Sequence, residues 1–563
     1  MNPTSGEARE TGVRESDSPD SRWYEWALPV IVLVSLIPRL LLALNQYVEY
    51  DGYWHVWIAQ QDRWDNFIRE YRANAHPPLY FLLLRMSFWF GRTQLAYRGV
   101  SLLSGAASVY VLGRTALKAM RSPVWAALAA LAYGLALPSI LLSNEVRTYM
   151  LSAFLVQVSF LYFLDLTGEV QPATPGPRVM FGVMATLACL SEYYAAFYVG
   201  ATMLIALALP IVRREKRVFR SLLRELATFV LILALPVWEY ISHFGTTSVA
   251  YDHLPGYYYN PDGAESAVDF LLRNLRNELN WFSPLPVAEG TPFYATLGAL
   301  LLVACAIVFL ARRWSASRNR AAIVSLLLPL VMLCAVVTAS LIRAYPFGGF
   351  LRQQYVLFPF LMVCPFLLPD RLFDGASRLS LALTGVLAVG ILAVSVRNYE
   401  AWPKSGRLLM SDQMERYNRL FPSAGAVYID QFNLTTFLTH HHDWKWEFIA
   451  PVPGMDWVDV YKLSRGGRSI LLFRDKNRWN LDLREQLLYT SIAKGIGAWH
   501  LPAMTIFCIT QTHPLGRTDA QIAAYRDRVA ELSAAHGLCV ETLDLQNFDV
   551  YAEFRPSGTC TGK

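Results

Sequence analysis

The sequence predicts a polytopic α-helical membrane protein with a soluble C-terminal α/β domain. Of the 563 residues, 54% are hydrophobic and only 17% are charged, whereas a soluble chain carries roughly 25% charged residues. Apolar runs long enough to cross a bilayer recur between residues 26 and 396. After about residue 399, short apolar strands alternate with amphipathic helices, which favours a small domain with a largely parallel sheet.

The apolar runs number about eleven, and we expect a transmembrane domain over residues 23–398. We place them at roughly 26–44, 97–117, 122–142, 147–166, 177–191, 193–212, 222–241, 294–311, 321–342, 351–369 and 376–396. Residues 1–22 are polar and lack the apolar stretch of a signal peptide, so we expect a disordered tail there.

Basic residues orient the predicted spans. Lys and Arg cluster in four loops, around residues 114–121, 213–220, 312–320 and 371–378. The positive-inside rule places all four loops in the cytoplasm, together with the N-terminus. The remaining connections then face outward: 45–96, 145–147, 242–293, 343–350 and the domain at 399–563. The basic clusters form no continuous stripe and the net charge of +6 is modest, which argues against a nucleic-acid partner.

The segment His76–Gly91 tests this topology. It is apolar but only 16 residues long, and Arg85 interrupts it. A crossing here would reverse the side of every later loop and place the basic clusters outside. We therefore expect a helix that lies in the outer interface, with Pro77 and Pro78 in its first turn.

Asp51 follows the first span within a few residues and lies in a loop rich in Tyr and Trp. A carboxylate there can act as a general base towards an acceptor hydroxyl or amine. The structural alternative is an exposed aspartate that caps a short helix. His55 and His76 in the same loop could bind a phosphate or a metal, or orient the acceptor, although a lone interfacial histidine is more often a satisfied polar group. Pro77 and Pro78 restrict the position of the His76 ring.

Glu145, Arg147 and Tyr149 form a second polar cluster, where two spans meet on the outward side. Arg147 could neutralise a phosphate by bidentate contact, and Glu145 could hold that arginine, an acceptor or a metal. On a helix, Glu145 and Tyr149 would share a face. The structural alternative is an ion pair that only caps the turn, but charged groups next to lipid are costly to desolvate and are therefore functional candidates.

More arginines are predicted on the outward side. Arg98 begins the second span, and Arg343 and Arg352 bracket a loop that contains Tyr345. Several arginines around one cavity suit an anionic headgroup such as a pyrophosphate or a phosphodiester. Each arginine alone could instead extend to lipid phosphates. The Glu-Tyr-Tyr segment at 192–194 lies at another outward turn and could line the same cavity.

The cysteine and histidine patterns indicate no metal site. Four cysteines lie in apolar spans and are expected to act as small hydrophobic residues: Cys189, Cys305, Cys334 and Cys364. If the C-terminal domain lies outside the cytoplasm, a Cys539–Cys560 disulfide can form there. The histidine run at 440–442 indicates a solvated surface feature, because consecutive side chains on a helix diverge. The sequence has no phosphate-binding loop.

Taken together, these motifs resemble a known family. The order and predicted side of Asp51, His55, His76-Pro77-Pro78, Arg98 and Glu145-x-Arg147-x-Tyr149 are similar to the protein O-mannosyltransferase family and its bacterial relatives (glycosyltransferase family 39), including the lipid A aminoarabinose transferases. Tyr345-Pro346-Phe347-Gly348 followed by Arg352 also resembles a later outward loop of that family. The resemblance covers about residues 25–400.

The resemblance implies a C-type glycosyltransferase fold in the bacterial inner membrane. Such an enzyme moves one sugar from a polyprenyl-phosphate carrier to a lipid, glycan or protein acceptor at the outer face, with inversion. The resemblance implies no required cofactor and leaves a divalent cation open. The family typically has Asp-Glu at its first motif, whereas Gly52 stands in the second position here, so the resemblance does not assign the acceptor.

The resemblance also implies roles for individual residues. Asp51 would be the catalytic base, with Glu145 and Arg147 beside it in the catalytic group. The donor phosphate and the remaining substrate would be contacted by His55, His76, Arg98, Tyr149, Tyr345 and Arg352.

Two other functions stay open. A transporter or flippase of polyprenyl-linked glycans would carry ionisable residues in mid-span and inverted repeats, whereas the charges here lie mainly at the outward ends of spans. A polymerase or ligase of lipid-linked glycans would concentrate function in a large late outer loop, and residues 242–293 could form that loop. The soluble domain could bind an acceptor or a partner, or only cover the cavity.

Overall fold

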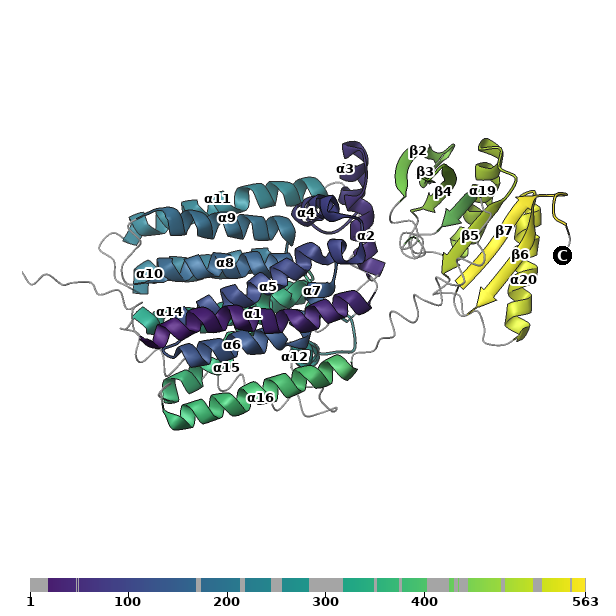
Figure 1. Cartoon of the computed structure of the whole chain (residues 1–563). Coiled ribbons are helices and arrows are strands. Elements are labelled where there is room, and N and C mark those ends of the chain that lie inside the picture. The colour runs from purple at the N-terminus through teal and green to yellow at the C-terminus, as the bar shows by residue number, and fades with distance from the viewer. Residues whose placement is uncertain are drawn as a thin grey trace, which may run out of the picture. The chain divides into compact units, whose positions relative to one another are not determined.

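The computed structural model shows a helical protein with a C-terminal sheet domain (Figure 1). It describes residues 19–561 except 47, 49, 169–173, 213–217, 245–255, 283–316, 349–351, 374–376, 402–424, 430–433, 435–443, 477–480, 510–518 and 547–548. The chain divides into two compact units. Unit 1 comprises residues 1–41, 101–144 and 148–402, and unit 2 comprises residues 42–100, 145–147 and 403–563.

Unit 1 is built from apolar helices, several of which run roughly parallel in Figure 1. Its helices, of which α1 and α5 extend into unit 2, are α1 (Pro19–Asn45), α5 (Gln94–Ala119), α6 (Pro123–Leu135), α7 (Leu137–Asn144), α8 (Tyr149–Thr167), α9 (Gly176–Ser191), α10 (Ala195–Val212), α11 (Val218–Phe244), α12 (Ala267–Phe282), α14 (Ser317–Leu341), η4 (Arg352–Leu357), α15 (Phe358–Leu372) and α16 (Arg378–Ala401).

The polytopic helical class is confirmed, with fewer spans than expected. Among the described residues, seven helices are long and apolar enough to cross a membrane, or up to eight if one bent pair is counted as a span. The expected run at 177–191 is the 16-residue helix α9, which belongs to the shorter apolar helices. The expected run at 222–241 lies within α11, which is not among the seven. The expected run at 294–311 lies outside the described residues.

The bent pair is α6 and α7, which meet at 51°. The chain breaks at Ala136, whose backbone is extended. Pro138 in the first turn of α7 has no N–H to donate to the carbonyl of Gly134, four residues earlier, so the helix cannot continue through this point with its regular hydrogen bonds. The expected single run at 122–142 is therefore two helices.

The loop after α1 contributes three short helices to unit 2: α2 (Tyr50–Ala59), α3 (Trp64–Arg72) and α4 (Leu79–Ser87), which continues into η2 (Phe88–Phe90). The apolar helix Leu79–Phe90 is shorter than the helices that could span a membrane. A short helix in this segment was expected, with Pro77 and Pro78 in its first turn. The helix instead begins at Leu79, and Pro78 flanks its N-terminus. Its position in the outer interface stays a prediction.

The C-terminal part of unit 2 is a seven-stranded sheet with the order β2-β3-β4-β1-β5-β7-β6. Its elements are β1 (Ala426–Ile429), β2 (Lys445–Val452), β3 (Met455–Arg465), β4 (Arg468–Asp475), α19 (Leu481–Ala498), β5 (Met504–Ile509), α20 (Asp519–Ala535), β6 (Leu538–Gln546) and β7 (Asp549–Pro556). The expected alternation of strands and helices is confirmed, with helices expected at Leu483–Lys494 and Asp519–His536 found as α19 and α20. A helix was also expected from the end of β1 to about His440; apart from Leu434, that segment and the histidine run at 440–442 lie outside the described residues.

The expectation of a largely parallel sheet was wrong, because the sheet is mixed. Among the described strands, only β1 pairs in parallel, with β4 and β5. The hairpin of β2 and β3 was not predicted, and β3 pairs antiparallel with β4. Near the C-terminus β7 pairs antiparallel with both β5 and β6. The pairs β2–β3, β3–β4 and β6–β7 follow one another closely in the chain, and a short connection between neighbouring strands forces antiparallel pairing. The strands β5 and β7 are separated by α20 and β6.

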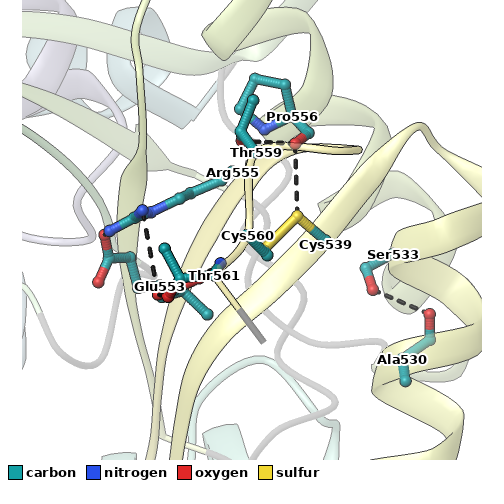
Figure 2. Close-up of a disulfide and its surroundings, with 10 residues drawn as sticks. Ala530, Ser533, Cys539, Glu553, Arg555, Pro556, Thr559, Cys560 and Thr561 are labelled. Atoms are coloured by element: carbon teal, nitrogen blue, oxygen red, sulfur yellow. Dashed lines mark hydrogen bonds and ion pairs between the residues drawn. A yellow bond between two sulfur atoms is a disulfide. The ribbon is translucent and has the colours of Figure 1, made fainter. Parts of the chain in front are cut away.

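A disulfide joins Cys539 in β6 to Cys560 beyond β7, the pairing that the sequence left open (Figure 2). It links two segments that are 21 residues apart next to the β6–β7 hairpin. Of the cysteines predicted in apolar spans, Cys189 and Cys364 are buried and Cys334 is exposed. Cys305 lies outside the described residues.

Candidate active site

Asp51 and Arg147 form an ion pair in unit 2. Asp51 lies in the first turn of α2, directly after the first apolar helix, and Arg147 lies in the turn between α7 and α8. The Arg147 Nη2 atom is 2.5 Å from the Asp51 carboxylate, with side chains that are 14% and 39% exposed, respectively. A guanidinium–carboxylate contact of this length is a charge-assisted hydrogen bond. The structure thus brings together the predicted base and a predicted phosphate ligand.

Gly52 explains why these two segments can approach so closely. A β-carbon at position 52 would lie 2.6 Å from Cγ1 of Val48 and 3.2 Å from Cβ of Val146. Val146 is the buried neighbour of Arg147 in the turn. The departure from the family's Asp-Glu motif therefore has a local steric reason, because a glutamate would not fit here.

His55 and His76 lie next to each other within unit 2, with ring centroids 5.3 Å apart. The Nδ1–H of His55 donates to the backbone carbonyl of Asp51 at 2.8 Å, which fixes the ring one turn along α2 from the predicted base. Its ring stacks on Phe81 at 5.0 Å. Both histidines are buried, so they support the Asp51 turn within an aromatic core rather than line an open surface.

Arg98 lies in the first turn of α5 and is buried. Its Nη1 atom donates to the backbone carbonyl of Ala43 at 3.4 Å. Ala43 is in the last turn of α1, where carbonyl groups lack helical partners and favour a cation. This contact gives Arg98 a structural role at the end of α1, and its predicted contact with a donor phosphate stays a prediction.

Glu145 and Tyr149 do not share a helix face as expected. Residues 145–148 form bends rather than a helical turn, and Tyr149 is the first residue of α8. Glu145 is half-buried in the same turn as Arg147. Tyr149 is buried in the hydrophobic core of unit 1, where it packs between helices.

Tyr345 lies in the predicted outward loop 343–350, and Arg352 lies just beyond it, both in unit 1. Tyr345 is half-buried and packs against the ring of Tyr194, with centroids 5.5 Å apart. The loop is tied to the 256–260 segment, because the Phe347 N–H donates to the Tyr257 carbonyl at 2.9 Å. Arg352 begins η4 and is half-buried. Two segments that are far apart in sequence, and that were both predicted on the outward side, are therefore neighbours.

The sequence did not single out Glu278, a fully buried carboxylate near Tyr194 in unit 1. Both of its carboxyl oxygens are buried without a hydrogen-bond partner among the described residues, as is the hydroxyl of Tyr194. Glu278 is close enough to Tyr194 to act on it electrostatically. Burial raises the pKa of Glu278 well above its usual value. The amphipathic pattern of α12 contains a signal for this site, since Glu278 falls on its buried face with Phe270 and Asn274.

Arg39 was also missed, although it lies within the first predicted span. Its side chain is fully buried, and within the described part of unit 1 its hydrogen bonds go only to neutral acceptors. Its Nη1 atom donates to the carbonyl of Gly134 at 2.6 Å, the group that Pro138 leaves without a helical donor. Its Nη2 and Nε atoms donate to Ser139 Oγ at 2.6 Å and Ser143 Oγ at 3.0 Å. Arg39 therefore stabilises the break between α6 and α7.

No protein-family model matches the chain, and no curated protein matches it. Solved structures do. ArnT from Cupriavidus metallidurans in the apo state matches with a TM-score of 0.56 at 13% identity, over 95% of this chain and 98% of ArnT. The same protein bound to undecaprenyl phosphate matches with a TM-score of 0.54 at 13% identity, over 96% and 99%.

A third similarity is to the archaeal oligosaccharyltransferase AglB from Archaeoglobus fulgidus, in complex with an inhibitory peptide and a dolichol-phosphate. Its TM-score is 0.42 at 12% identity, over 75% of this chain and 64% of AglB, which is too low to support an argument. The match to ArnT over nearly the whole of both chains shows that this chain has the fold of ArnT. The C-type glycosyltransferase assignment that the motifs implied is a prediction with which this fold agrees. The narrower family stays a prediction.

Proposed function

We propose that the chain is a membrane glycosyltransferase that moves a single sugar from a polyprenyl-phosphate donor to an acceptor on the extracytoplasmic side, with inversion at the anomeric carbon. The observation that carries this proposal is the Asp51–Arg147 pair, a base beside a phosphate-binding cation. It occurs at the end of a predicted span, in a chain with the fold of ArnT, which has been solved with bound undecaprenyl phosphate.

In the proposed reaction, an acceptor hydroxyl or amine attacks the anomeric carbon. The bond between that carbon and the phosphate oxygen breaks, and its electron pair leaves with the polyprenyl phosphate. The acceptor proton passes to the Asp51 carboxylate. A direct displacement inverts the anomeric centre and needs no second, covalent carboxylate. The Arg147 guanidinium stabilises the charge that develops on the leaving phosphate.

The resting ion pair sets the order of the steps in this reaction, with donor binding first. While Arg147 is bonded to Asp51, the guanidinium occupies a carboxylate oxygen that could otherwise accept the acceptor proton. A donor phosphate carries negative charge and competes for the same guanidinium N–H groups. Donor binding therefore draws Arg147 towards the phosphate and makes that carboxylate oxygen accessible to the acceptor proton when the sugar is in place.

The outward orientation of the site is part of the proposal. The Cys539–Cys560 disulfide supports it, because disulfides form and persist in oxidising compartments rather than in the bacterial cytoplasm. With the N-terminus in the cytoplasm of a bacterial inner membrane, the loop after α1 and the C-terminal domain lie outside. The lipid carrier then presents its sugar at the outer leaflet.

The test is sugar transfer by purified protein from a panel of polyprenyl-phosphate sugars, with release of polyprenyl phosphate as the readout. Asp51→Asn keeps the shape of the side chain but removes the base. We expect kcat to fall by about 100-fold or more. Transfer by Asp51→Asn at the wild-type rate would overturn the assigned base, and wild-type protein that releases no polyprenyl phosphate from any donor would overturn the function.

Asp65→Asn is the matched control. Asp65 forms another aspartate–arginine pair in the same loop, 2.8 Å from Arg63, with both side chains well exposed. Its loss removes the same charge from the loop without touching Asp51, so transfer should stay at the wild-type rate. A fall equal to that of Asp51→Asn would show that loop charge, rather than a positioned base, is what matters.

A transporter would use an ionisable residue within a span, and Arg39 is such a residue. Its hydrogen bonds to the Gly134 carbonyl and to two serine hydroxyls favour a structural role. The same assay separates the two functions, because transport moves a lipid-linked sugar without releasing polyprenyl phosphate.

A further inference from the structure

One face of the β2–β3–β4 meander in unit 2 carries charged and aromatic side chains. In the strand register Asp459 is opposite Arg474, and Tyr461 is opposite Phe448. Because side chains alternate along a strand, these four residues lie on one face. The residues that alternate with them, such as Phe473, pack on the other face in a core with α19 and α20.

This face contacts the two short helices that follow α1. Glu70 in α3 is buried and accepts a hydrogen bond from Nη1 of Arg474 at 2.6 Å. The same carboxylate oxygen accepts from the indole N–H of Trp57 in α2 at 3.0 Å. The Arg474 guanidinium lies over the rings of Trp57, at 4.8 Å, and Trp54, at 5.2 Å. Arg474 thus bonds to α3 and stacks on α2 at once.

A second arginine extends the contact in the opposite direction. Arg69 in α3 reaches Asp459 at 3.4 Å and the hydroxyl of Tyr461 at 3.3 Å, and its guanidinium lies 4.5 Å from the ring centroid of Phe448. Lys476 also pairs with Asp459, at 2.9 Å. Arg69 and Glu70 of α3 therefore both have a charged partner on the sheet.

The buried charges at this contact are balanced. Burial alone would raise the pKa of Glu70, but Arg474 and Arg69 outweigh burial and hold that pKa below its usual value. A buried carboxylate kept ionised by a partner on another element ties the two elements together, because separating them would leave a buried charge unpaired.

The helix that is held in this way also carries the proposed base. Asp51 and Trp54 are three residues apart in α2, and Trp57 follows one turn later. A helix of ten residues moves as one element, so a contact at Trp54 and Trp57 sets the direction in which Asp51 points. The C-terminal sheet and Arg147 therefore restrain α2 at two different places.

We infer that Glu70 and Arg474 are positioning residues, through which the C-terminal sheet holds α2 and keeps Asp51 in its reactive place. This inference rests on the proposed role of Asp51. It assigns the C-terminal domain a part in catalysis without a substrate contact of its own.

The experiment measures hydrogen exchange and transfer kinetics on the full-length protein. The Arg474→Met variant keeps the length and the apolar contacts of the side chain but loses its charge. We expect amides of α2 (Tyr50–Ala59) to exchange about 10-fold faster or more, with those of α8 unchanged. We expect kcat to fall by about 10- to 100-fold, with the KM for the donor nearly unchanged. Arg474→Lys keeps the charge and should fall between Arg474→Met and wild type in both measurements.

The control is Arg468→Met, on an exposed position of the same strand, which should leave exchange and kinetics unchanged. Glu70→Gln should reproduce Arg474→Met from the other side of the contact and covers the case in which one variant misfolds. Wild-type exchange of α2 in both folded variants would overturn the inference. The exchange readout does not depend on transfer, so faster exchange in a protein without any transferase activity would overturn the proposed function alone.

Discussion

Gly52 in α2 faces Val146, the neighbour of Arg147, across a gap that leaves no room for a larger side chain. A β-carbon at position 52 would come within 3.2 Å of the Val146 β-carbon. The absence of a side chain at this position sets how closely α2 approaches the turn. It therefore also sets the length of the Asp51–Arg147 contact.

Gly52→Ala should lower transfer activity although alanine favours a helix. The added methyl group must displace Val48 or Val146, and overpacking of this kind costs about 1–3 kcal/mol. We expect kcat to fall by at least about 10-fold because Asp51 is displaced from Arg147. Gly99→Ala in α5 is the control, since nothing lies within 4 Å of a β-carbon there, and it should be neutral or slightly stabilising. If Gly52→Ala kept full activity, the close approach would have no part in the reaction.

Arg39→Met should destabilise unit 1. The variant leaves the Gly134 carbonyl at the α6–α7 break without its donor and removes the bonds to Ser139 and Ser143, for a loss of roughly 2–4 kcal/mol. Thermal unfolding in detergent measures the effect. Arg114→Met is the comparison, because Arg114 pairs with Glu25 in an exposed position, where an ion pair contributes about 0–1 kcal/mol. Equal melting temperatures for the two variants would contradict the role of Arg39.

Glu278→Gln should stabilise the protein at alkaline pH. The pKa of Glu278 is raised in the folded state, so the folded protein binds more protons than the unfolded chain between the two pKa values. The free energy of unfolding therefore falls as the pH rises from the unfolded pKa through the folded one. Glutamine removes this dependence, and we expect a Tm gain of about 3 °C or more at pH 8 and little change at pH 4.

The control for this measurement is Glu265→Gln, whose sign should be opposite. The hydrogen bond from Arg273 lowers the pKa of the half-buried Glu265, so its charged form is the favoured one in the folded state. Loss of that charge should leave Tm at pH 8 unchanged or lower it. A Tm gain for Glu265→Gln equal to that of Glu278→Gln would point to net charge rather than burial as the cause.

Cys539 and Cys560 should become accessible to thiol reagents in intact cells only after a membrane-impermeant reductant is added. The disulfide protects both thiols, and in the proposed orientation the reductant reaches it from outside. Mass spectrometry of the labelled peptides identifies the modified cysteines. Labelling that requires cell lysis would reverse the proposed side of the C-terminal domain.

Local patterns predicted the parts of the fold that depend on neighbouring residues. The run Ala426–Ile429 is a buried strand, as its four apolar residues indicated. The predicted boundary between two helices near Glu192 is also confirmed, since Glu192, directly after Ser191, has an extended backbone. The β2–β3 hairpin escaped prediction, since β2 alternates between buried and exposed residues over only part of its length. The sheet was expected to be parallel because strand–helix alternation does not show which strands are joined by short turns.

The candidate site was predictable in its residues and not in most of its contacts. The sequence identified Asp51 and Arg147 as separate candidates, and the resemblance to a known family indicated that they share a site. No sequence pattern could show that Gly52 is required by Val146, or that Tyr149 packs in a core. Contacts such as Arg39 with Gly134 join positions 95 residues apart and follow from the tertiary fold, which local periodicity does not encode.

The Glu70–Arg474 contact also bears on the stage of biosynthesis at which the site is completed. The two residues are 404 positions apart, and ribosomes add about 5–20 residues per second. Glu70 therefore exists for roughly 20 to 80 s before Arg474 has been made. During that interval the helices after α1 have already left the ribosome while the sheet that covers them has not. The reactive arrangement is thus among the last features to form during biosynthesis, after the membrane helices have been inserted.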